Sequence, residues 1–397
     1  MDLDTFRELL AHPGQSALQL AASFAPTPAS FPACVDRVRK VYPAGLAKAA
    51  VEMVLFREKA RTKFPDADRL YFTRESLEQS SGHTIAAYRA RRFTPYESVA
   101  DLGCGIGGDT LALAAATRRV IAIEQAELLA AMAQANAAAR GLADRVEVTP
   151  GDALTLPLGG VQAAFADPGR RSGDKRFLAL ADYLPPPGEL HRRFPANFPL
   201  AFKVAPGLAR RELDHWDAEA EFLSVDGELK ECLLWCGPLR TAERRATLLS
   251  TMTGDAATFT GDPLVEPRPP SRPGEYVFDP AAALIRAELE HDFAEQQDLQ
   301  PVDDGVAFFT SSNATPTPFG DWYRVEHSAA FHLPRLREYL RANRVGRVTM
   351  LKRASSLDVN EVMRKLKLEG PEHRHVILTR CQGTPWAIVG QAHVASP

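Results

Sequence analysis

The stretch S-V-A-D-L-G-C-G-I-G-G-D-T-L-A-L-A-A-A-T-R-R-V-I-A-I-E, residues 98–124, carries the pattern that decides the fold of this chain. A short apolar run ends at Asp101, a glycine-rich turn follows, and an alanine- and leucine-rich segment comes next. A second apolar run then ends at Glu124. This succession predicts a strand, a tight turn, a helix and a second strand, the unit that holds a nucleotide-like cofactor over the carboxyl ends of a parallel sheet.

The glycine-rich turn has the composition of a ligand-binding loop. Gly103, Gly105, Gly107 and Gly108 allow the backbone to turn sharply and to approach a ligand closely, because they carry no Cβ. Glu124 follows about 20 residues later, where an acidic side chain reaches a ribose hydroxyl pair. Because the spacing also satisfies G-x-G-x-x-G, a dinucleotide site is a second interpretation, and a purely structural turn is a third.

Three acidic positions favour S-adenosylmethionine over NAD as the cofactor. Asp101 lies at a strand end, close to where a methionine ammonium needs a counter-charge. Asp152 follows a third apolar run, where it can accept a hydrogen bond from an exocyclic adenine amine. A fourth apolar run, V-Q-A-A-F-A, ends in the acidic-proline pair Asp167-Pro168 at the predicted mouth of the sheet.

A hairpin is predicted where the runs E-F-L-S-V and E-L-K-E-C-L-L-W are joined through Asp226-Gly227. This dipeptide accepts the positive φ angles of a type I′ turn, and a hairpin makes its two strands antiparallel. The predicted fold class is therefore α/β, with a doubly wound, Rossmann-like sheet that ends in an antiparallel hairpin.

The four motifs occur in the order seen in class I S-adenosylmethionine-dependent methyltransferases, which the chain resembles over roughly residues 70–240. The resemblance implies that Asp101 and the glycine turn hold the methionine part of the cofactor, Glu124 the ribose and Asp152 the adenine. The full set of implied cofactor-binding residues is Thr73, Asp101, Gly103, Cys104, Gly105, Gly107, Glu124, Gln125, Asp152 and Ala153.

The strip L-Y-F-T-R-E-S-L-E-Q-S-S-G-H-T-I-A-A-Y-R resembles the region upstream of the cofactor motif in trimethylguanosine synthases. There it folds over the methionine end of the cofactor, which would place Phe72, Thr73 and Tyr88 near the site. Thr73 also begins a capping-box pattern with Ser76, so an entry helix that packs on the sheet is a second interpretation.

The implied catalytic residues are Asp167, Pro168 and Arg170. An Asp/Asn-Pro-Pro-aromatic loop holds an exocyclic amine by a side-chain acceptor and a backbone carbonyl, while its aromatic ring stacks on a flipped-out base. This chain departs from that loop, since Gly169 stands at the second proline and Arg170 at the aromatic position. Arg170 could stack on a base or grip a phosphate, or it could be a structural loop residue. The departure leaves the acceptor atom, and activity itself, open.

Four regions are predicted along the chain: helical 1–69, a methyltransferase domain 70–260, a proline-rich linker 261–275, and an α+β domain 276–397. Within the last region, a helix is expected over residues 281–295 and a hairpin near the end. This region resembles a THUMP-like domain in two segments, Y-V-F-D-P-A-A-A-L-I-R-A and R-V-G-R-V-T-M-L-K-R. Because THUMP domains proper bind RNA, this resemblance implies RNA as a partner.

Composition and charge favour a cytoplasmic protein. The 397 residues include five scattered cysteines and no apolar run of membrane-spanning length, and the amino-terminal segment lacks a signal-peptide layout. The cysteines and histidines show no metal-ligand spacing, so we expect no metal. Oligomeric state cannot be deduced.

The net charge of −3 means that any RNA-binding surface must be local. Basic residues follow the fourth and fifth strands at 170–176, 191–193, Lys203 and Arg210-Arg211, and residues 331–381 carry 12 Lys/Arg against 5 Asp/Glu. The predicted function is methylation of a base nitrogen in RNA. Two alternatives stay open: a methyltransferase acting on a protein or small molecule, and a cofactor-binding RNA-binding protein without turnover.

Overall fold

The computed structural model describes residues 1–169, 171–172, 175–176 and 179–394. The chain divides into two compact units, and the strand β9 contributes to both. The first unit contains Met1–Ala218, Leu233–Thr241 and Thr251–Gly254, and the second contains Glu219–Cys232, Ala242–Ser250 and Asp255–Pro397. Among the described residues, we find no helix with the length and apolar character needed to span a bilayer.

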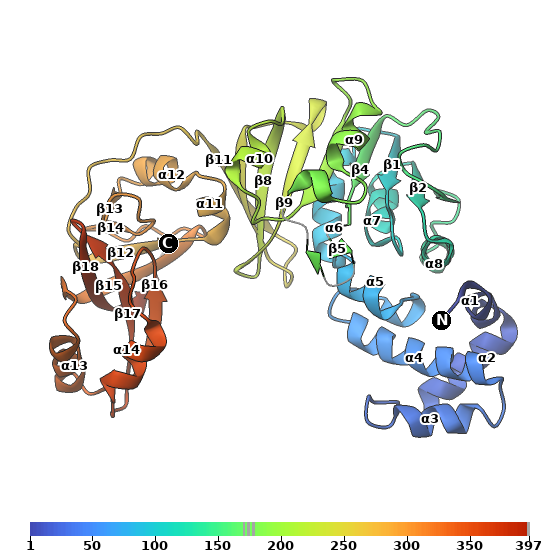
Figure 1. Cartoon of the computed structure of the whole chain (residues 1–397), viewed down its shortest axis with the longest axis horizontal. Coiled ribbons are helices and arrows are strands. Elements are labelled where there is room, and N and C mark those ends of the chain that lie inside the picture. The colour runs from blue at the N-terminus through green and yellow to red at the C-terminus, as the bar shows by residue number, and fades with distance from the viewer. Residues whose placement is uncertain (170, 173–174, 177–178, 395–397) are drawn as a thin grey trace. The chain divides into compact units, whose positions relative to one another are not determined.

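The predicted helical amino-terminal region consists of α1 (Leu3–Leu10), α2 (His12–Ser23), α3 (Phe31–Val38) and α4 (Ala44–Ala60) (Figure 1). Asp2 caps α1 by accepting a hydrogen bond from the Thr5 N–H at 2.8 Å, and prolines occupy the first turns of α2 and α3. Phe6, Val51 and Met53 are fully buried in a core that also includes Met132 of the sheet domain. These helices therefore share one apolar core with the sheet domain.

The segment between α4 and the sheet contains η1 (Ala67–Arg69), α5 (Arg74–Gln79), α6 (His83–Ala90) and η2 (Arg91–Phe93). Its link to the sheet domain is the buried amide of Asn136, which accepts from the Tyr71 N–H at 2.8 Å. The same amide donates to the carbonyls of Tyr71 and Ile106 at 3.1 and 2.9 Å. Lys63 closes the carboxyl end of α5, since its ammonium donates to the carbonyls of Leu77 and Ser80.

The first sheet follows the doubly wound pattern that the sequence predicts. Its strand order is β11-β10-β8-β9-β7-β4-β1-β2-β3. Its elements are β1 (Ser98–Leu102), α7 (Gly108–Ala116), β2 (Arg119–Glu124), α8 (Glu127–Ala139), β3 (Val146–Pro150), β4 (Ala163–Ala166), β5 (Arg171–Ser172), β6 (Lys175–Arg176), η3 (Leu180–Asp182), α9 (Pro187–Arg192), β7 (Leu200–Val204), α10 (Arg210–Leu213), β8 (Ala218–Val225), β9 (Glu228–Cys236), η4 (Gly237–Leu239), β10 (Arg244–Leu249) and β11 (Ala256–Gly261).

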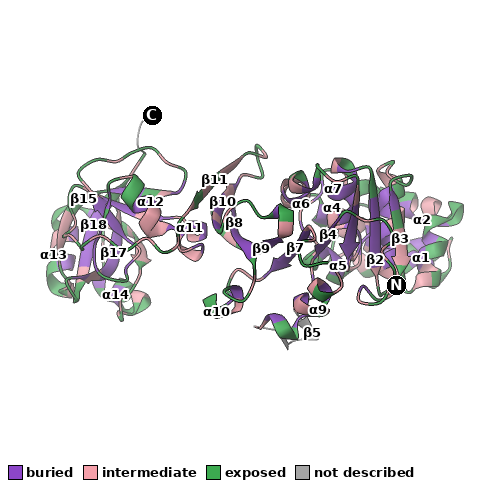
Figure 2. Ribbon diagram, turned by 90° about the horizontal axis from the view of Figure 1, so that it is seen from above, coloured by how far each residue is buried: buried purple, intermediate pink, exposed green. Residues whose placement is uncertain are grey.

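The strands β3, β2, β1, β4 and β7 are parallel neighbours, so their carboxyl ends meet at one edge. The central strands are almost wholly buried, as expected for a sheet covered by helices on both faces (Figure 2). The helix α7 packs against β1 and β2, and α8 packs against β2 and β3. The carboxyl edge of an open α/β sheet is where this class of fold binds ligands.

The predicted hairpin is present between β8 and β9. Asp226 and Gly227 have φ angles of 48° and 83°, the positive values that a type I′ turn requires. The later strand β9 lies between β7 and β8, which gives the antiparallel end expected from the sequence. Two further strands continue beyond the hairpin: β10 pairs with β8 in parallel, and β11 pairs with β10 in antiparallel orientation.

The second unit contains a sheet with strand order β13-β14-β12-β15-β18-β17-β16. Its elements are β12 (Tyr276–Pro280), α11 (Ala282–Arg286), α12 (Glu290–Gln296), β13 (Gln300–Pro301), β14 (Phe309–Ser311), β15 (Gly320–Ala330), α13 (Leu333–Ala342), β16 (Val345–Lys352), α14 (Val359–Leu366), β17 (Glu372–Cys381) and β18 (Thr384–His393). The prediction of one helix over residues 281–295 is wrong. Glu288 has a φ of 59°, which a continuous right-handed helix cannot contain, so α11 and α12 are separate.

Candidate functional site

Most of the predicted site residues follow the carboxyl ends of four parallel strands. Asp101 is the penultimate residue of β1, and Glu124 is the last residue of β2. Asp152 follows β3, and Asp167 follows β4. The register pairs Leu102 with Ile123 and with Ala166, so these strand ends lie at one level. The structure thus brings the four carboxylates to one edge of the sheet.

The glycine turn between β1 and α7 forms an open cradle. Gly103, Gly105 and Gly107 have φ angles of 85°, 56° and 87°, a region that other residues rarely adopt. A Cβ added to Gly103 or Gly105 would meet no heavy atom within 4 Å, so the backbone there borders open space. A Cβ on Gly107 would lie 3.4 Å from the Ala133 Cβ, which means that this glycine instead serves the packing of α8.

Glu124 is tied to the glycine turn by its carboxylate. Its Oε2 accepts a hydrogen bond from the Gly105 N–H at 2.9 Å, and its Oε1 accepts from the Ala126 N–H at the same distance. Gln125, which is exposed, lies between β2 and α8. The carboxylate therefore fixes the turn from the neighbouring strand.

Asp101 is a buried carboxyl group, with a relative exposure of 1%. Its Oδ2 accepts a hydrogen bond from the Thr110 hydroxyl at 2.5 Å. The pKa of Asp101 is raised to about 8: burial is the largest cause, the negative charges of Asp109 and Asp167 contribute to the increase, and the Thr110 hydrogen bond and the charge of Arg89 oppose it. Asp109 is itself paired with the buried guanidinium of Arg89 at 2.5 Å.

Asp167 forms an ion pair with Lys203, whose Nζ donates to Asp167 Oδ2. The same ammonium donates to the Ser81 hydroxyl at 3.3 Å. Pro168 is buried, and Gly169 exchanges two backbone hydrogen bonds with Leu184, at 2.8 and 3.0 Å. These contacts fix the described part of the loop after β4. Arg170, the third predicted catalytic residue, lies outside the described residues.

Asp152 and Ala153 occupy a turn after β3. Asp152 is exposed, and its Oδ1 accepts from the Leu154 N–H at 2.8 Å. Ala153 is buried, and its carbonyl accepts from the Arg193 guanidinium, which also reaches the Leu156 carbonyl. Arg193 was predicted among the basic residues that follow the fourth and fifth strands. In the structure its two hydrogen bonds also stabilise the turn that contains Asp152.

Cys104 and Thr73 are held in packed surroundings. Cys104 is 8% exposed, and burial raises the pKa of its thiol well above the usual value, which makes it a poor nucleophile. The predicted capping box at Thr73 is present: its hydroxyl accepts from the Ser76 N–H at 3.1 Å, and Ser76 Oγ accepts from the Thr73 N–H at 2.9 Å. Thr73 also lines a cavity of about 210 Å³ with Met53 and Phe56 of α4.

Several residues around the site were missed by sequence reasoning. These are Thr110, Asp109 and Arg89, which surround Asp101. Lys203 was predicted among the basic residues that follow the fourth and fifth strands, but its pairing with Asp167 and its burial, with only 9% of the side chain exposed, were not predicted. Two signals could have indicated them. A charged residue inside the apolar run L-A-F-K-V needs a buried partner, and Asp-Thr in the first helical turn lies within reach of the preceding strand.

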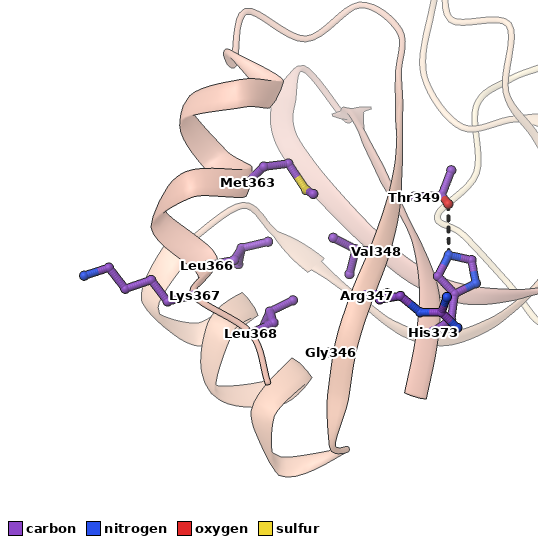
Figure 3. A pocket seen from close by; sticks show the side chains of 9 residues that line it. All are labelled: Gly346, Arg347, Val348, Thr349, Met363, Leu366, Lys367, Leu368 and His373. Carbon is purple, nitrogen blue, oxygen red and sulfur yellow. Dashed lines mark hydrogen bonds between the residues drawn. The ribbon is translucent and has the colours of Figure 1, made fainter. Parts of the chain in front are cut away.

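The second unit contains a cavity of about 540 Å³ between α14 and the edge strand β16. Val348, Met363, Leu366 and Leu368 turn toward this space, and Lys367 points outward (Figure 3). Polar groups flank the apolar lining: the Thr349 hydroxyl and the His373 Nε2 are 2.9 Å apart, beside Arg347.

Comparison with known families gives three matches along the chain. A methyltransferase domain matches residues 99–166, which include the glycine turn and the strands up to β4. A THUMP domain-like family matches residues 320–392, and a domain of unknown function matches residues 2–60.

Among individual proteins, an uncharacterised S-adenosylmethionine-dependent methyltransferase of Mycobacterium tuberculosis is 29% identical over 340 residues, which cover 83% of this chain and 92% of the relative. A 23S rRNA (uracil(1939)-C(5))-methyltransferase, RlmD, of Polynucleobacter necessarius is 34% identical over 117 residues, covering 28% of this chain and 25% of that protein.

Among solved structures, a putative methyltransferase from Porphyromonas gingivalis W83 has a TM-score of 0.77 and 21% identity, and the alignment covers 97% of this chain and 98% of that chain. This likeness shows that the fold is shared along nearly the whole length. The relation to trimethylguanosine synthases stays a prediction. The fold, the methyltransferase-domain match and the mycobacterial relative identify the chain as a Rossmann-like, S-adenosylmethionine-dependent methyltransferase with a THUMP-like carboxyl-terminal domain.

Proposed function

We propose that this protein transfers a methyl group from S-adenosylmethionine to a nitrogen of a base in RNA. The observation that carries the proposal is the shared edge at which Asp167 and the glycine turn lie. Leu102 and Ala166, the residues just before the glycine turn and Asp167, are paired neighbours on β1 and β4, so the loops that follow the two strands start side by side.

The residues of the carboxyl edge fit the cofactor. Gly103 and Gly105 border open space with positive φ angles, which is the backbone that a bound nucleoside needs. In the proposal, Asp101 faces the methionine ammonium, Glu124 the ribose hydroxyls and Asp152 the adenine amine. The remaining contacts come from Thr73, Cys104, Gly107, Gln125 and Ala153.

The chemistry asked of the protein is mostly alignment. When bound, S-adenosylmethionine supplies an activated methyl group attached to a sulfonium, so the protein supplies orientation and exclusion of water. Asp167 and the Pro168 carbonyl would each accept a hydrogen bond from an exocyclic amine. With both hydrogens held, the lone pair of that nitrogen points toward the methyl group, and Arg170 would contact the base or a phosphate.

Two features support RNA as the acceptor. Residues 331–381 of the THUMP-like region carry 12 Lys/Arg against 5 Asp/Glu, which gives a local basic surface on a chain of net charge −3. One relative, similar over 117 residues of this chain, is named as an rRNA methyltransferase. The predicted region boundaries at 69/70, 260/261 and 275/276 belong to the same proposal. So does a cytoplasmic location, which the five free, buried cysteines favour.

The decisive experiment is transfer of a labelled methyl group into total RNA, followed by nucleoside analysis. We expect label in one base for the wild-type protein and at least a hundredfold loss for Asp167→Ala, with cofactor affinity nearly unchanged. Label in protein alone, or in no macromolecule, would contradict the proposal.

A second candidate function is an RNA-binding protein that holds the cofactor without turnover. The observation that favours it is the loop after β4, where glycine replaces the second proline of the amine-methylating loop. In that case RNA would bind with a steep salt dependence, and no RNA tested would gain label.

A further inference from the structure

The ion pair of Lys203 and Asp167 lies at the start of the loop after β4. The methyl transfer as proposed above assigns a role to Asp167 and none to Lys203. Lys203 lies in the all-buried strand β7, and the register of β4 and β7 pairs Ala166 with Phe202. The next residues are therefore Asp167, directly after β4, and Lys203 of β7, which lie side by side at the carboxyl edge. A lysine with 9% of its side chain exposed costs desolvation energy, and such groups gather at functional sites.

Within the described part of the chain, the pair leaves one N–H donor of Lys203 and one oxygen of Asp167 without a side-chain partner in the other residue. An ammonium has three N–H donors, and Lys203 directs one to Asp167 Oδ2 and one to the Ser81 hydroxyl. A carboxylate has two oxygens, and only Asp167 Oδ2 receives the lysine. The Asp167 side chain is 25% exposed against 9% for Lys203, so the carboxylate is the more accessible group of the pair.

The pair also lies beside the cofactor loop. Ser81, the second partner of Lys203, is buried, and its carbonyl would lie 3.5 Å from a Cβ placed on Gly108, the first residue of α7. The position of the ammonium is thus set by both the acceptor strand and the segment next to the glycine turn.

On the basis of the proposed function, we propose that Lys203 selects the base: its third N–H donates to an unprotonated ring nitrogen that adjoins the amine held by Asp167. Adenine presents this order on its Watson–Crick edge, with the N6 amine beside N1, and cytosine presents it with the N4 amine beside N3. On the same Watson–Crick edge guanine presents its N2 amine beside the N1–H, so two donors would face each other; its unprotonated N3 lies on the edge next to the ribose, which the proposal leaves unread. The acceptor is therefore an adenine or a cytosine.

Lys203 acts here as a positioning residue, since the methyl group passes to the amine nitrogen. In the transfer, the new N–C bond forms as the S–C bond breaks, the electron pair remains on sulfur, and the amine gives one proton to solvent. A merely structural lysine would stabilise the loop after β4 without reading the ring nitrogen, so the test must separate stability from base discrimination.

The experiment has two arms, both on the full chain. Nucleoside analysis of labelled RNA should find N6-methyladenosine or N4-methylcytidine. Oligonucleotides of the modified sequence then carry the normal base or its deaza analogue, 1-deazaadenine or 3-deazacytosine, which lacks the ring nitrogen. We expect the wild-type protein to favour the normal base by roughly tenfold in kcat/KM, the usual cost of one unmade hydrogen bond.

The variants decide the role of the lysine. Lys203→Met should bring that ratio close to one, and Lys203→Arg, which keeps a donor, should restore part of it. The control is Lys230→Met, which removes an exposed lysine paired with Glu228 at 2.5 Å: it should leave the ratio at its wild-type value.

Three outcomes would overturn the inference while methylation of RNA stands: methylated guanine or uracil, equal rates on the normal and deaza bases, or a ratio unchanged in a folded Lys203→Met. Absence of any label in RNA with wild-type protein would instead overturn the proposed function, and the base selection with it.

Discussion

Replacing Asp101 by asparagine should stabilise the protein and weaken its cofactor binding at the same time. The pKa of Asp101 is raised to about 8 from an ordinary value of 3.8, with burial as the largest cause. Between these two values the folded chain holds a proton that the unfolded chain has lost. The free energy of unfolding therefore falls as the pH rises from 3.8 through 8, because the unfolded state binds fewer protons.

The magnitude follows from the shift. One pKa unit corresponds to about 1.4 kcal/mol, so keeping this proton at pH 7 costs the folded state at most about 4 kcal/mol. An asparagine of the same shape is neutral in both states and can still accept from Thr110. We expect Asp101→Asn to raise the free energy of unfolding by up to ~4 kcal/mol at pH 7, with little gain near pH 4.

Urea unfolding followed by hydrogen exchange in peptides from β1 and β2 measures this change in the first unit alone. The matched control is Asp109→Asn, which removes the carboxylate paired with buried Arg89 and should lower stability by about 3 kcal/mol. Calorimetry should show cofactor affinity reduced at least tenfold in Asp101→Asn. A variant less stable than wild type at pH 7, or a gain that does not change with pH, would refute the reasoning.

Three further outcomes are expected. Glu124→Ala removes the acceptor for two backbone N–H groups and should weaken cofactor binding at least tenfold by calorimetry; unchanged affinity would contradict the assignment of Glu124. Gly107→Ala should lower the free energy of unfolding by about 1–3 kcal/mol, because φ is 87° and the new Cβ approaches Ala133, and a neutral effect would show that the turn relaxes. Burial raises the pKa of Glu290 to about 7 from 4.5, so the free energy of unfolding of the second unit falls as the pH rises between these values. Glu290→Gln should remove up to ~3 kcal/mol of that loss, measured by denaturant titrations at pH 5 and pH 8.

The parts of the fold that could be predicted depend on neighbours in the sequence. The glycine turn is local, and the Asp226-Gly227 hairpin needs only two central residues with positive φ. The acidic residues at the strand ends could be placed at one edge because parallel strands share their direction. Their roles toward the cofactor stay predictions.

The rest could not be predicted because it depends on residues far apart in the chain. The pairing of Lys203 with Asp167 joins positions 36 residues apart, and Arg89 reaches Asp109 across 20 residues. Neither pairing leaves a periodic signal. The break between α11 and α12 was missed for the opposite reason, since residues 281–295 have the composition of a good helix while Glu288 adopts a left-handed φ.

The amide of Asn136 has a consequence for how such proteins can be recombined. One side chain satisfies both backbone groups of Tyr71 and the carbonyl of Ile106. The segment between α4 and the sheet, here called the entry segment, and the glycine turn therefore depend on the same residue of α8. A chimera that exchanges the glycine turn together with α8, and takes α8 from a homologue with another residue at position 136, would keep its glycines and still leave the buried backbone groups of Tyr71 without their partner. The smallest exchangeable module therefore runs from the entry segment through α8.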